Sequence, residues 1–496
     1  MKLPVTRNIA LAVVGLSSLS RPGLADPPPE PPPLIEIYGT ILPFLEVSHT
    51  TGATAPGTTG ASQVAPAAYT GANARVRNRM DMGTSNLGFR GGVELVHDLS
   101  VIWQIESGVQ TDGSPGANTI ASRNSQIGLT GSWGTAFFGQ WDTPYKWSTV
   151  TLVNPIRGGF VPDYNGLLDG PGFGVSSVAT QPTRANTAAD AAFDRRQGNS
   201  LQYWSPTVGG LSARLLYSIT EGRTTATATA PSIKPSIFGA SLAFEQGPFK
   251  LRDALEVHYD YFGMSQLGGS PGDSVTNRSS TDLGNKVMAM YTHAASGFDT
   301  RVLGVFEYLQ YKNKDSAPTA INQFSRSAVY GLVEQSLGKH HLWVAYGQAY
   351  QGSCQRVDGS DCTTKGLGAT DSVLGYLYRI SKSTDFFAVA YRIDNEASAT
   401  YSTFPTLAPP TAPGATVEGF GIGMVYTFAA KISAPPKTAP APEPASPPAP
   451  ATPTPAPTTE PGPVPPPGAV APDVPAPGPA PGAPTPEPAP APPPHG

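Results

Sequence analysis

The stretch Glu418–Phe428, EGFGIGMVYTF, decides the fold because large apolar and small residues alternate along it. Successive side chains of a strand point to opposite faces, so one face carries Phe420, Ile422, Met424, Tyr426 and Phe428. The other face is nearly bare, with Gly419, Gly421 and Gly423, and we expect it to line an unobstructed interior. Residues 429–496 are mostly proline, alanine and small polar residues, so they cannot supply a layer to cover the apolar face. Such a strand fits the wall of a membrane barrel.

Composition favours a barrel over a bundle of transmembrane helices. The chain has 496 residues, of which 14 % are charged, and its mean hydropathy is −0.17. Beyond the N-terminus no run approaches the roughly 18 consecutive apolar residues that a transmembrane helix requires.

Residues 1–25 are predicted to be an export signal. Lys2 and Arg7 precede an apolar run, and Gly23-Leu24-Ala25 places small residues before a cleavage site after Ala25. A short membrane anchor is the alternative, but the apolar run is too short to span a bilayer. Without this segment the chain is mildly acidic, which argues against nucleic acid as a partner. Residues 26–33, DPPPEPPP, read as an extended polyproline spacer.

The chain has two cysteines, Cys354 and Cys362, within GSCQRVDGSDC. In an exported chain, two cysteines close in sequence and flanked by glycine and serine predict a disulfide in a loop. No histidine lies near them, so we expect no metal site there.

A repeating unit organises residues 34–428. Two alternating strands meet at a short turn, and a longer polar loop leads to the next pair. The short turns are predicted at 96–98, 131–134, 206–210, 246–248, 295–297, 337–339 and 382–384. The long loops are predicted near 48–72, 111–121, 143–197, 220–234, 263–283, 312–324, 351–370 and 396–416. This arrangement predicts an all-β fold, a sixteen-stranded antiparallel transmembrane β-barrel.

The barrel has to close because lipid cannot form hydrogen bonds with an unpaired backbone. Backbone groups that face lipid must all be paired, so the sheet has to close by pairing residues 34–47 with residues 417–428. Short turns at one end and long loops at the other are typical of outer-membrane barrels. With an even number of strands both termini are expected on the periplasmic side.

One segment conflicts with simple alternation. Arg75, Arg77 and Arg79 share the parity of the apolar face that follows them, with Leu87 as its first member. Either a bulge near Gly83 reverses the faces, or this end of the strand stands above the membrane.

The chain resembles the general diffusion porins of Gram-negative outer membranes, the trimeric sixteen-stranded kind. The resemblance covers about residues 34–428 and rests on loose motifs in the family's order. They are IEIYG (35–39), SNLGFRGGVEL (85–95), VIWQIESG (101–108), RNSQIGLTGSWGT (123–135), NSLQYWSPTVGGLSARLLYS (199–218) and GFGIGMVYTF (419–428).

The resemblance implies a third loop, about residues 143–197, that folds into the barrel and narrows it. Its constriction residues would be Arg157, Asp163, Tyr164 and Asp169, which would face wall positions Asn86, Arg90, Arg123, Gln140, Arg195 and Arg196. Asn86 and Gln140 stand where the family usually has arginine, so the constriction should be less positive than the family norm.

The end of the chain also departs from the family. In family members the last strand resembles a signal that the barrel-assembly machinery reads. Gly423, Tyr426 and Phe428 have the spacing of that signal. Family members usually stop there, whereas this chain continues. Residues 429–496 are expected to form a disordered Pro/Ala-rich periplasmic tail, because they lack the apolar surface needed to fold.

These observations predict a homotrimer in outer-membrane lipid that forms a water-filled pore for passive diffusion of small hydrophilic solutes and ions. One alternative is a substrate-selective channel, with Arg75, Arg77, Arg79 and Arg90 as a basic ladder or merely as solvated rim charges. Another is a barrel that anchors a tail bound to peptidoglycan. We expect no enzyme, cofactor or metal, since there is no nucleophile elbow and the seven histidines are scattered. GFGIG (419–423) lacks the helix that a dinucleotide-binding loop requires.

Overall fold

The computed structural model describes residues 35–54, 73–110, 119–159, 166–172, 192–219, 225, 232, 234–260, 279–313, 321–360, 362–403 and 411–432. These residues form one antiparallel sheet and one short helix, α1 (Pro144–Val150). The strands are β1 (Ile35–Ile41), β2 (Phe44–Thr51), β3 (Arg77–Asp81), β4 (Asn86–Val96), β5 (Leu99–Gly108), β6 (Ser125–Gly131), β7 (Gly134–Asp142), β8 (Arg196–Trp204), β9 (Leu211–Ile219), β10 (Ser236–Gln246), β11 (Phe249–Tyr259), β12 (Ser280–Ala295), β13 (Phe298–Asn313), β14 (Ile321–Leu337), β15 (His340–Ala349), β16 (Ser353–Arg356), β17 (Ala369–Arg379), β18 (Thr384–Asn395) and β19 (Thr416–Ile432).

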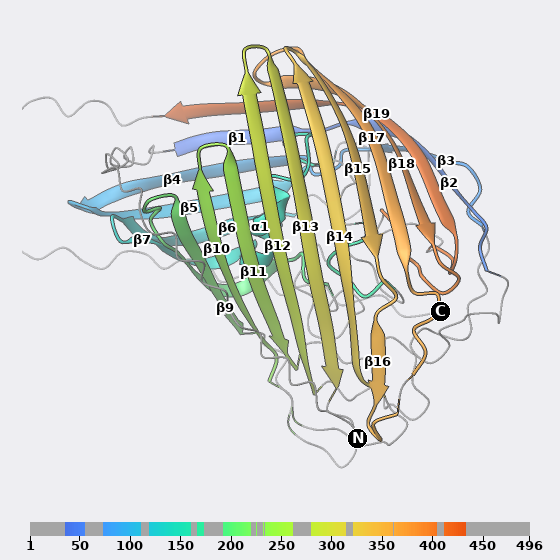
Figure 1. Ribbon diagram of the computed structural model, residues 1–496. Helices are drawn as coiled ribbons and strands as arrows, with labels where there is room; N and C mark the ends of the chain where they lie inside the picture. The colour runs from blue at the N-terminus through green and yellow to red at the C-terminus, as the bar shows by residue number, and fades with distance from the viewer. Residues whose placement is uncertain are drawn as a thin grey trace, which may run out of the picture. The chain divides into compact units, whose positions relative to one another are not determined.

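The nineteen segments are sixteen barrel strands, because three strands are each interrupted once. The interrupted strands are β1 with β2, β3 with β4, and β15 with β16 (Figure 1). Each strand pairs with its neighbour in the chain, and β19 closes the barrel on β1 and β2. The predicted closure is therefore confirmed, with Phe428 opposite Gly39 and Gly423 opposite Phe44. β19 continues beyond Phe428, where the sequence prediction ended it, and pairs with β1 up to Ile432.

All seven short turns lie where the sequence predicts them. Several use a glycine in the left-handed region, such as Gly247, Gly297 and Gly338, which tight turns favour. The strands on the loop side are longer than expected. β12 already begins at Ser280 and β14 at Ile321, inside the predicted loops 263–283 and 312–324.

A bulge reverses the faces of the second barrel strand. Opposite Thr40 and Phe44 of the first strand lie Asn86 and Asp81, so the second strand carries one extra residue between them. The irregular segment contains Gly83, whose φ of 50° is one that side chains with a Cβ rarely adopt. Arg79 consequently lies inside, where its side chain forms an ion pair with Glu46 at 2.8 Å. The first of the two predicted explanations is therefore confirmed.

The outer face is apolar, as expected for a wall in lipid. Exposed side chains include Leu242, Phe386, Phe420 and Ile422. Trp343, an aromatic residue near a short turn, does not face lipid, since it lies inside the barrel and is buried.

The glycine face of β19 is not bare, which corrects the expectation of an unobstructed interior. A Cβ on Gly419 would lie 2.3 Å from the Tyr391 ring, and a Cβ on Gly423 would lie 2.5 Å from the Phe387 ring. These glycines make room for aromatic rings from β18.

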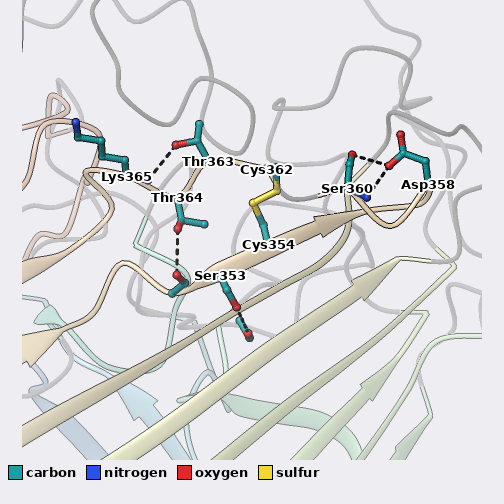
Figure 2. Close-up of a disulfide and its surroundings, with 10 residues drawn as sticks. Ser353, Cys354, Asp358, Ser360, Cys362, Thr363, Thr364 and Lys365 are labelled. Carbon is teal, nitrogen blue, oxygen red and sulfur yellow. Dashed lines mark hydrogen bonds between the residues drawn. A yellow bond between two sulfur atoms is a disulfide. The ribbon is translucent and has the colours of Figure 1, made fainter. Parts of the chain in front are cut away.

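The loop side carries the disulfide. Cys354 of β16 and Cys362 are joined, with their Cα atoms 5.4 Å apart (Figure 2). They close a short external turn in which the Ser360 backbone N–H donates to Asp358 Oδ1 at 2.9 Å. Among the residues described above, no helix is long and apolar enough to cross a membrane.

Candidate functional site: the lumen and its third loop

The third loop turns into the barrel at the end of β7 through α1. Thr143 caps the helix, and its Oγ1 accepts a hydrogen bond from the Lys146 backbone N–H at 3.3 Å. Pro144 occupies the first turn, where no backbone donor is required. The helix contacts β10, β11 and β12, so the loop starts along one side of the lumen.

An apolar side of the loop packs on the inner wall. Val153, Ile156, Leu167 and Leu168 are fully buried and belong to one cluster with inward residues of β12 to β19, among them Met288, Leu303, Tyr330, Val373 and Val389. A Cβ on Gly347 of β15 would lie 2.9 Å from Leu167 Cδ1, so the loop and the wall touch closely. This burial holds the loop against one half of the barrel interior.

Two wall arginines hold the first part of the loop by its backbone. Arg252 Nη1 of β11 donates to the Trp147 carbonyl and to Thr151 Oγ1, both at 2.9 Å. Arg301 Nη1 of β13 donates to the Leu152 carbonyl at 2.6 Å. These contacts fix where the segment after α1 runs.

Arg157, predicted at the constriction, forms an ion pair with the wall. Its Nε donates to Asp385 Oδ2 of β18 at 2.6 Å, and Arg379 of β17 contacts the other oxygen at 3.2 Å. The Asp385 side chain is fully buried. Arg157 therefore fastens the loop close to the turn between β17 and β18.

Asp169, also predicted at the constriction, does not face an open lumen. Its side chain is fully buried, and Lys286 Nζ of β12 donates to its Oδ1 at 2.7 Å. Its backbone N–H donates to Glu307 of β13 at 2.8 Å. Asp169 is therefore neutralised in a buried ion pair with Lys286 and does not act on solutes as a free charge.

The same buried cluster clamps the loop backbone. Arg326 of β14 donates through Nε to the Gly170 carbonyl at 2.8 Å and through Nη2 to the Leu167 carbonyl at 3.0 Å. Arg326 Nη2 also lies 3.1 Å from Glu307 Oε2.

Tyr145 of α1 donates a hydrogen bond from its hydroxyl to Glu307 Oε1 at 2.6 Å. Burial, reinforced by the Glu307 charge, raises the pKa of this hydroxyl. Tyr145 therefore stays a hydrogen-bond donor at physiological pH. We call Lys286, Glu307, Arg326, Asp169 and Tyr145 the loop latch.

The other predicted loop residues, Asp163 and Tyr164, lie outside the described residues. Arg195, predicted on the pore wall, is fully buried at the base of the loop. Its carbonyl accepts a hydrogen bond from the Thr143 N–H at 3.1 Å, which joins the two ends of the loop.

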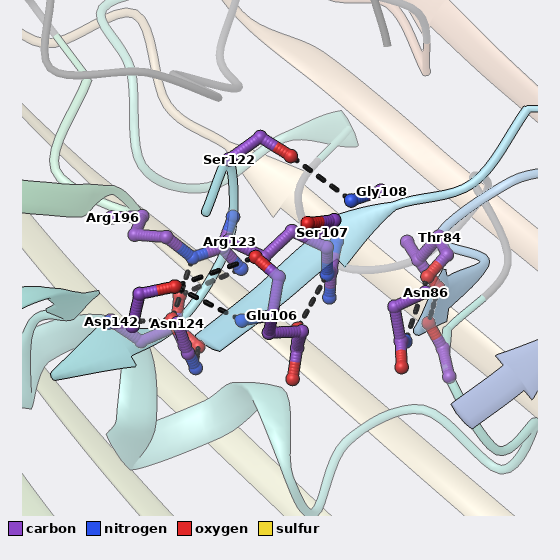
Figure 3. A network of polar contacts seen from close by, with 12 residues as sticks. Thr84, Asn86, Glu106, Ser107, Gly108, Ser122, Arg123, Asn124, Asp142 and Arg196 are labelled. Carbon is purple, nitrogen blue, oxygen red and sulfur yellow. Dashed lines mark hydrogen bonds and ion pairs between the residues drawn. The ribbon is translucent and has the colours of Figure 1, made fainter. Parts of the chain in front are cut away.

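Two predicted wall arginines come together on the opposite half of the barrel (Figure 3). Arg123 Nε lies 2.6 Å from Glu106 Oε1, and Arg196 Nη2 lies 3.3 Å from Asp142 Oδ1. Asn124, the residue that follows Arg123, connects the two ion pairs because its Oδ1 accepts a hydrogen bond from Arg196 Nε at 2.6 Å. The resemblance implied loop acids opposite these arginines, but here carboxylates of the wall itself compensate them.

The remaining predicted wall residues lie along the same half. Gln140 Nε2 donates to the Ser122 carbonyl at 2.9 Å, and Asn86 Nδ2 donates to the Thr84 carbonyl at 3.1 Å. Arg90 Nε lies 3.0 Å from Glu36 Oε2, the residue opposite it on β1.

The ion pairs between wall carboxylates and wall arginines, and the contacts of other wall arginines with the loop, were not predicted from the sequence. A signal was available, because Glu36 and Arg90 lie directly opposite each other once the register of β1 against β4 is known. No such signal exists for Arg326 and the loop carbonyls, which are more than 150 residues apart in the chain. Among the described residues, no group of three or more histidine, cysteine or acidic side chains is arranged to hold a metal ion.

Comparison with known proteins agrees with this geometry. Residues 30–398 match the family model described as "Gram-negative porin". The major outer membrane protein P.IA of Neisseria meningitidis is 31 % identical over 129 residues, which span 25 % of this chain and 30 % of that protein. The chain therefore aligns with less than a third of the length of this relative.

One solved structure supports the same fold. The anion-selective porin from Comamonas acidovorans has a TM-score of 0.52 at 15 % identity, covering 79 % of this chain and 99 % of that one. OmpT of Vibrio cholerae has a TM-score of 0.48 at 11 % identity, covering 79 % of this chain and 97 % of that one. The match of the family model over most of the chain, together with the closed sixteen-stranded barrel and its infolded third loop, means that the protein belongs to the Gram-negative porin family, the channel-forming barrels of the outer membrane.

Proposed function

We propose that small hydrophilic solutes and ions diffuse passively along the polar half of the lumen, between the third loop and the wall formed by β1 and β4–β8. The observation that carries this proposal is that the interior of the barrel has an apolar half and a charged half. The loop is packed on the apolar inner face of β12–β19, whereas the opposite wall keeps water-accessible charges. The Arg90 side chain is 49 % exposed and the Arg123 side chain 23 % exposed.

The proposed selectivity is mild. Confined water strengthens the field of fixed charges, but the paired wall arginines largely cancel with their carboxylates. We therefore expect transport to depend mainly on solute size and only weakly on the sign of the charge.

The test is conductance in a planar lipid bilayer. Purified, folded protein should insert in discrete steps of ohmic current, and detergent alone should give none. A folded preparation that stays silent would contradict the proposal. The reversal potential across a KCl gradient then measures the ion preference.

We also propose how the barrel is assembled and placed. It forms a homotrimer through the apolar outer faces of the closing strands, with Ile35, Ile37 and Ile41 on β1 and Phe420, Ile422 and Met424 on β19. The assembly machinery reads Gly423, Tyr426 and Phe428, and both termini lie in the periplasm. Because residues 429–432 belong to β19, the segment that reaches toward peptidoglycan is residues 433–496. Support for the last point is the proline-rich composition of that segment. Chemical cross-linking and peptidoglycan pull-down of the full chain test these points separately.

A further inference from the structure

A four-layer stack of indole and guanidinium groups lies inside the barrel. Trp204 of β8 and Trp147 of α1 enclose Arg214 of β9, whose Cζ lies 4.0 Å and 3.7 Å from the two ring centroids. Arg252 covers the other face of Trp147 at 3.9 Å. A guanidinium held between two indoles has both faces occupied, so only its N–H edge remains for other partners.

The position of Arg214 is fixed from both sides. It lies directly opposite Trp204 on β8 and Ser241 on β10, and all three side chains point inward. The Trp204 ring is oriented by its own N–H, which donates to Gln202 Oε1 at 3.2 Å. Trp147 is held because its carbonyl accepts from Arg252. The loop thus supplies one side of the clamp and the wall supplies the other.

Arg214 differs from six other arginines of the inner wall, because it has no ion-paired carboxylate among the residues that the structure describes. Arg90, Arg123, Arg196, Arg252, Arg301 and Arg326 each have a carboxylate within ion-pair distance. Within the described part of the chain, no carboxylate lies that close to Arg214, and its contacts are the two indoles. The residue is only partly buried, so water in the lumen reaches part of its side chain.

A second polar group beside Arg214 is also unpartnered. The Ser241 side chain is 4 % exposed, and among the described residues its hydroxyl has no hydrogen-bond partner. Directly opposed side chains on neighbouring strands have Cβ atoms about 5 Å apart, so this hydroxyl and the guanidinium edge can serve the same ligand. Glu245 and Asp142 act on the Arg214 charge only from beyond ion-pair distance. An unused donor next to a cation without an ion-paired carboxylate is the arrangement that an anion requires.

The neighbourhood also indicates what kind of anion fits. Trp141 and Phe137 meet the Trp204 ring edge to face, at centroid distances of 5.5 Å and 4.9 Å. Phe137 is buried, but Trp141 and Trp204 are partly exposed. A planar apolar solute can lie against these two rings, whereas a strongly hydrated ion gains nothing from them. The carboxylate would accept from the Arg214 edge in the two-pronged geometry that guanidinium favours.

We propose that Arg214, Ser241, Trp147 and Trp204 form a binding subsite in the lumen for small aromatic carboxylates on their way through the channel. The inference rests on the proposed channel function and adds a solute class to it. Transient binding at this point would raise the local concentration of such anions and favour their passage over that of neutral solutes of equal size.

The test is block of single-channel current by benzoate, with the neutral isostere benzamide as the matched probe. Benzoate should interrupt the current of the wild-type channel at concentrations where benzamide has no effect. Arg214→Gln should raise the half-blocking benzoate concentration at least about tenfold, because a charged hydrogen bond is lost. It should also lower the chloride-to-potassium permeability ratio about threefold, as expected for a unit charge acting across about 7 Å of water.

Arg214→Lys keeps the positive charge but removes the planar guanidinium, so it distinguishes specific carboxylate binding from the effect of charge alone. The ion preference should stay within the error of the wild type, whereas benzoate block should weaken several-fold because lysine cannot bind a carboxylate through two parallel donors. Arg392→Gln is the control, since it removes a positive charge from an exposed ion pair on the outer face of the barrel. Its conductance, ion preference and block should match the wild type.

The outcomes discriminate clearly. Equal benzoate block of the wild type, Arg214→Gln and Arg214→Lys channels overturns the subsite while leaving the channel function intact. Weaker block in Arg214→Gln alone would reduce the proposal to a general field effect and overturn the specific site. Absence of any conductance in the folded wild type would instead refute the proposed function. Heat-modifiable migration on SDS gels confirms that each variant is folded before it is measured.

Discussion

Arg157 in the third loop is ion-paired with Asp385 on β18, and the Arg157 Nε lies 2.6 Å from Asp385 Oδ2. The two residues are 228 positions apart in the chain. The carboxylate is fully buried, and the arginine side chain is 29 % exposed. The loop is thus tied to the wall at its first half as well as at the latch.

Loss of this tie should loosen the loop. Arg157→Met leaves a buried carboxylate with one partner fewer and should lower the free energy of unfolding by about 2 kcal/mol, less than for a fully buried pair. Open-channel current noise should rise because the loop then moves more freely. Arg379→Met is the control, because Arg379 contacts the same carboxylate but its side chain is 41 % exposed. It should cost less than about 1 kcal/mol, and equal effects of the two variants would contradict the assignment.

The loop latch should be more sensitive than any surface pair. Arg326→Gln removes the partner of Glu307 and the donors to two loop carbonyls in a fully buried site, which should cost about 3–5 kcal/mol. Denaturant unfolding in micelles, followed by tryptophan fluorescence, measures the loss. Arg392→Gln in an exposed pair should change stability by less than about 1 kcal/mol. If Arg326→Gln unfolds like the control, the latch does not hold the loop.

Two glycines of the wall should differ in how substitution by alanine changes the stability of the barrel. A Cβ on Gly375 would lie 2.0 Å from the Trp343 ring, so Gly375→Ala should cost about 1–3 kcal/mol through overpacking. Gly304 has nothing within 4 Å of such a Cβ and faces outward. Gly304→Ala should therefore be neutral or slightly stabilising. The thermal midpoint of the folded band on SDS gels compares them, and a similar loss in both would exclude ring packing as the cause.

Deletion of Gly83 should disturb the barrel more than deletion of a loop glycine. Without the extra residue, Arg77 and Arg79 would turn toward lipid, which costs up to about 2–4 kcal/mol for each arginine near the membrane centre. The Arg79–Glu46 ion pair would also be lost. Refolding yield into detergent should fall sharply. Deletion of Gly52, which lies just beyond β2, should leave the yield nearly unchanged, and normal refolding without Gly83 would show that the bulge is dispensable.

The end of β19 should decide how much of the C-terminus the barrel needs. A chain that ends at Ile432 keeps every pair between β19 and β1, and we expect it to assemble and conduct like the full chain. A chain that ends at Phe428 loses the pairs of Ile35 to Tyr38 with their partners and should be less stable. The thermal midpoints of the two truncated chains measure this difference. Failure of the longer chain to assemble would give residues 433–496 a role in barrel formation.

The sequence by itself determined the barrel. Strict alternation in stretches such as Glu418–Phe428, together with short turns at one end of each strand pair, leaves few folds for a chain with no covering layer. The sequence also predicted the bulge near Gly83 as one of two explanations for Arg75, Arg77 and Arg79, which cannot face lipid, and the register of the strands decided between them. These features are local, or depend on the contrast between lipid and water, and both can be read along the chain.

Only the tertiary structure decided what happens inside. Asp169 looks like a free acid of the constriction in the sequence, yet it is neutralised by Lys286 on a strand far away in the chain. The glycine face of β19 looks open, yet rings of Tyr391 and Phe387 cover it. Arg214 stands out only after arginines such as Arg90, Arg123 and Arg326 have been matched with their carboxylates. Such pairings depend on register and on the path of the third loop, and neither is fixed by alternation, because alternation specifies a face and not a neighbour.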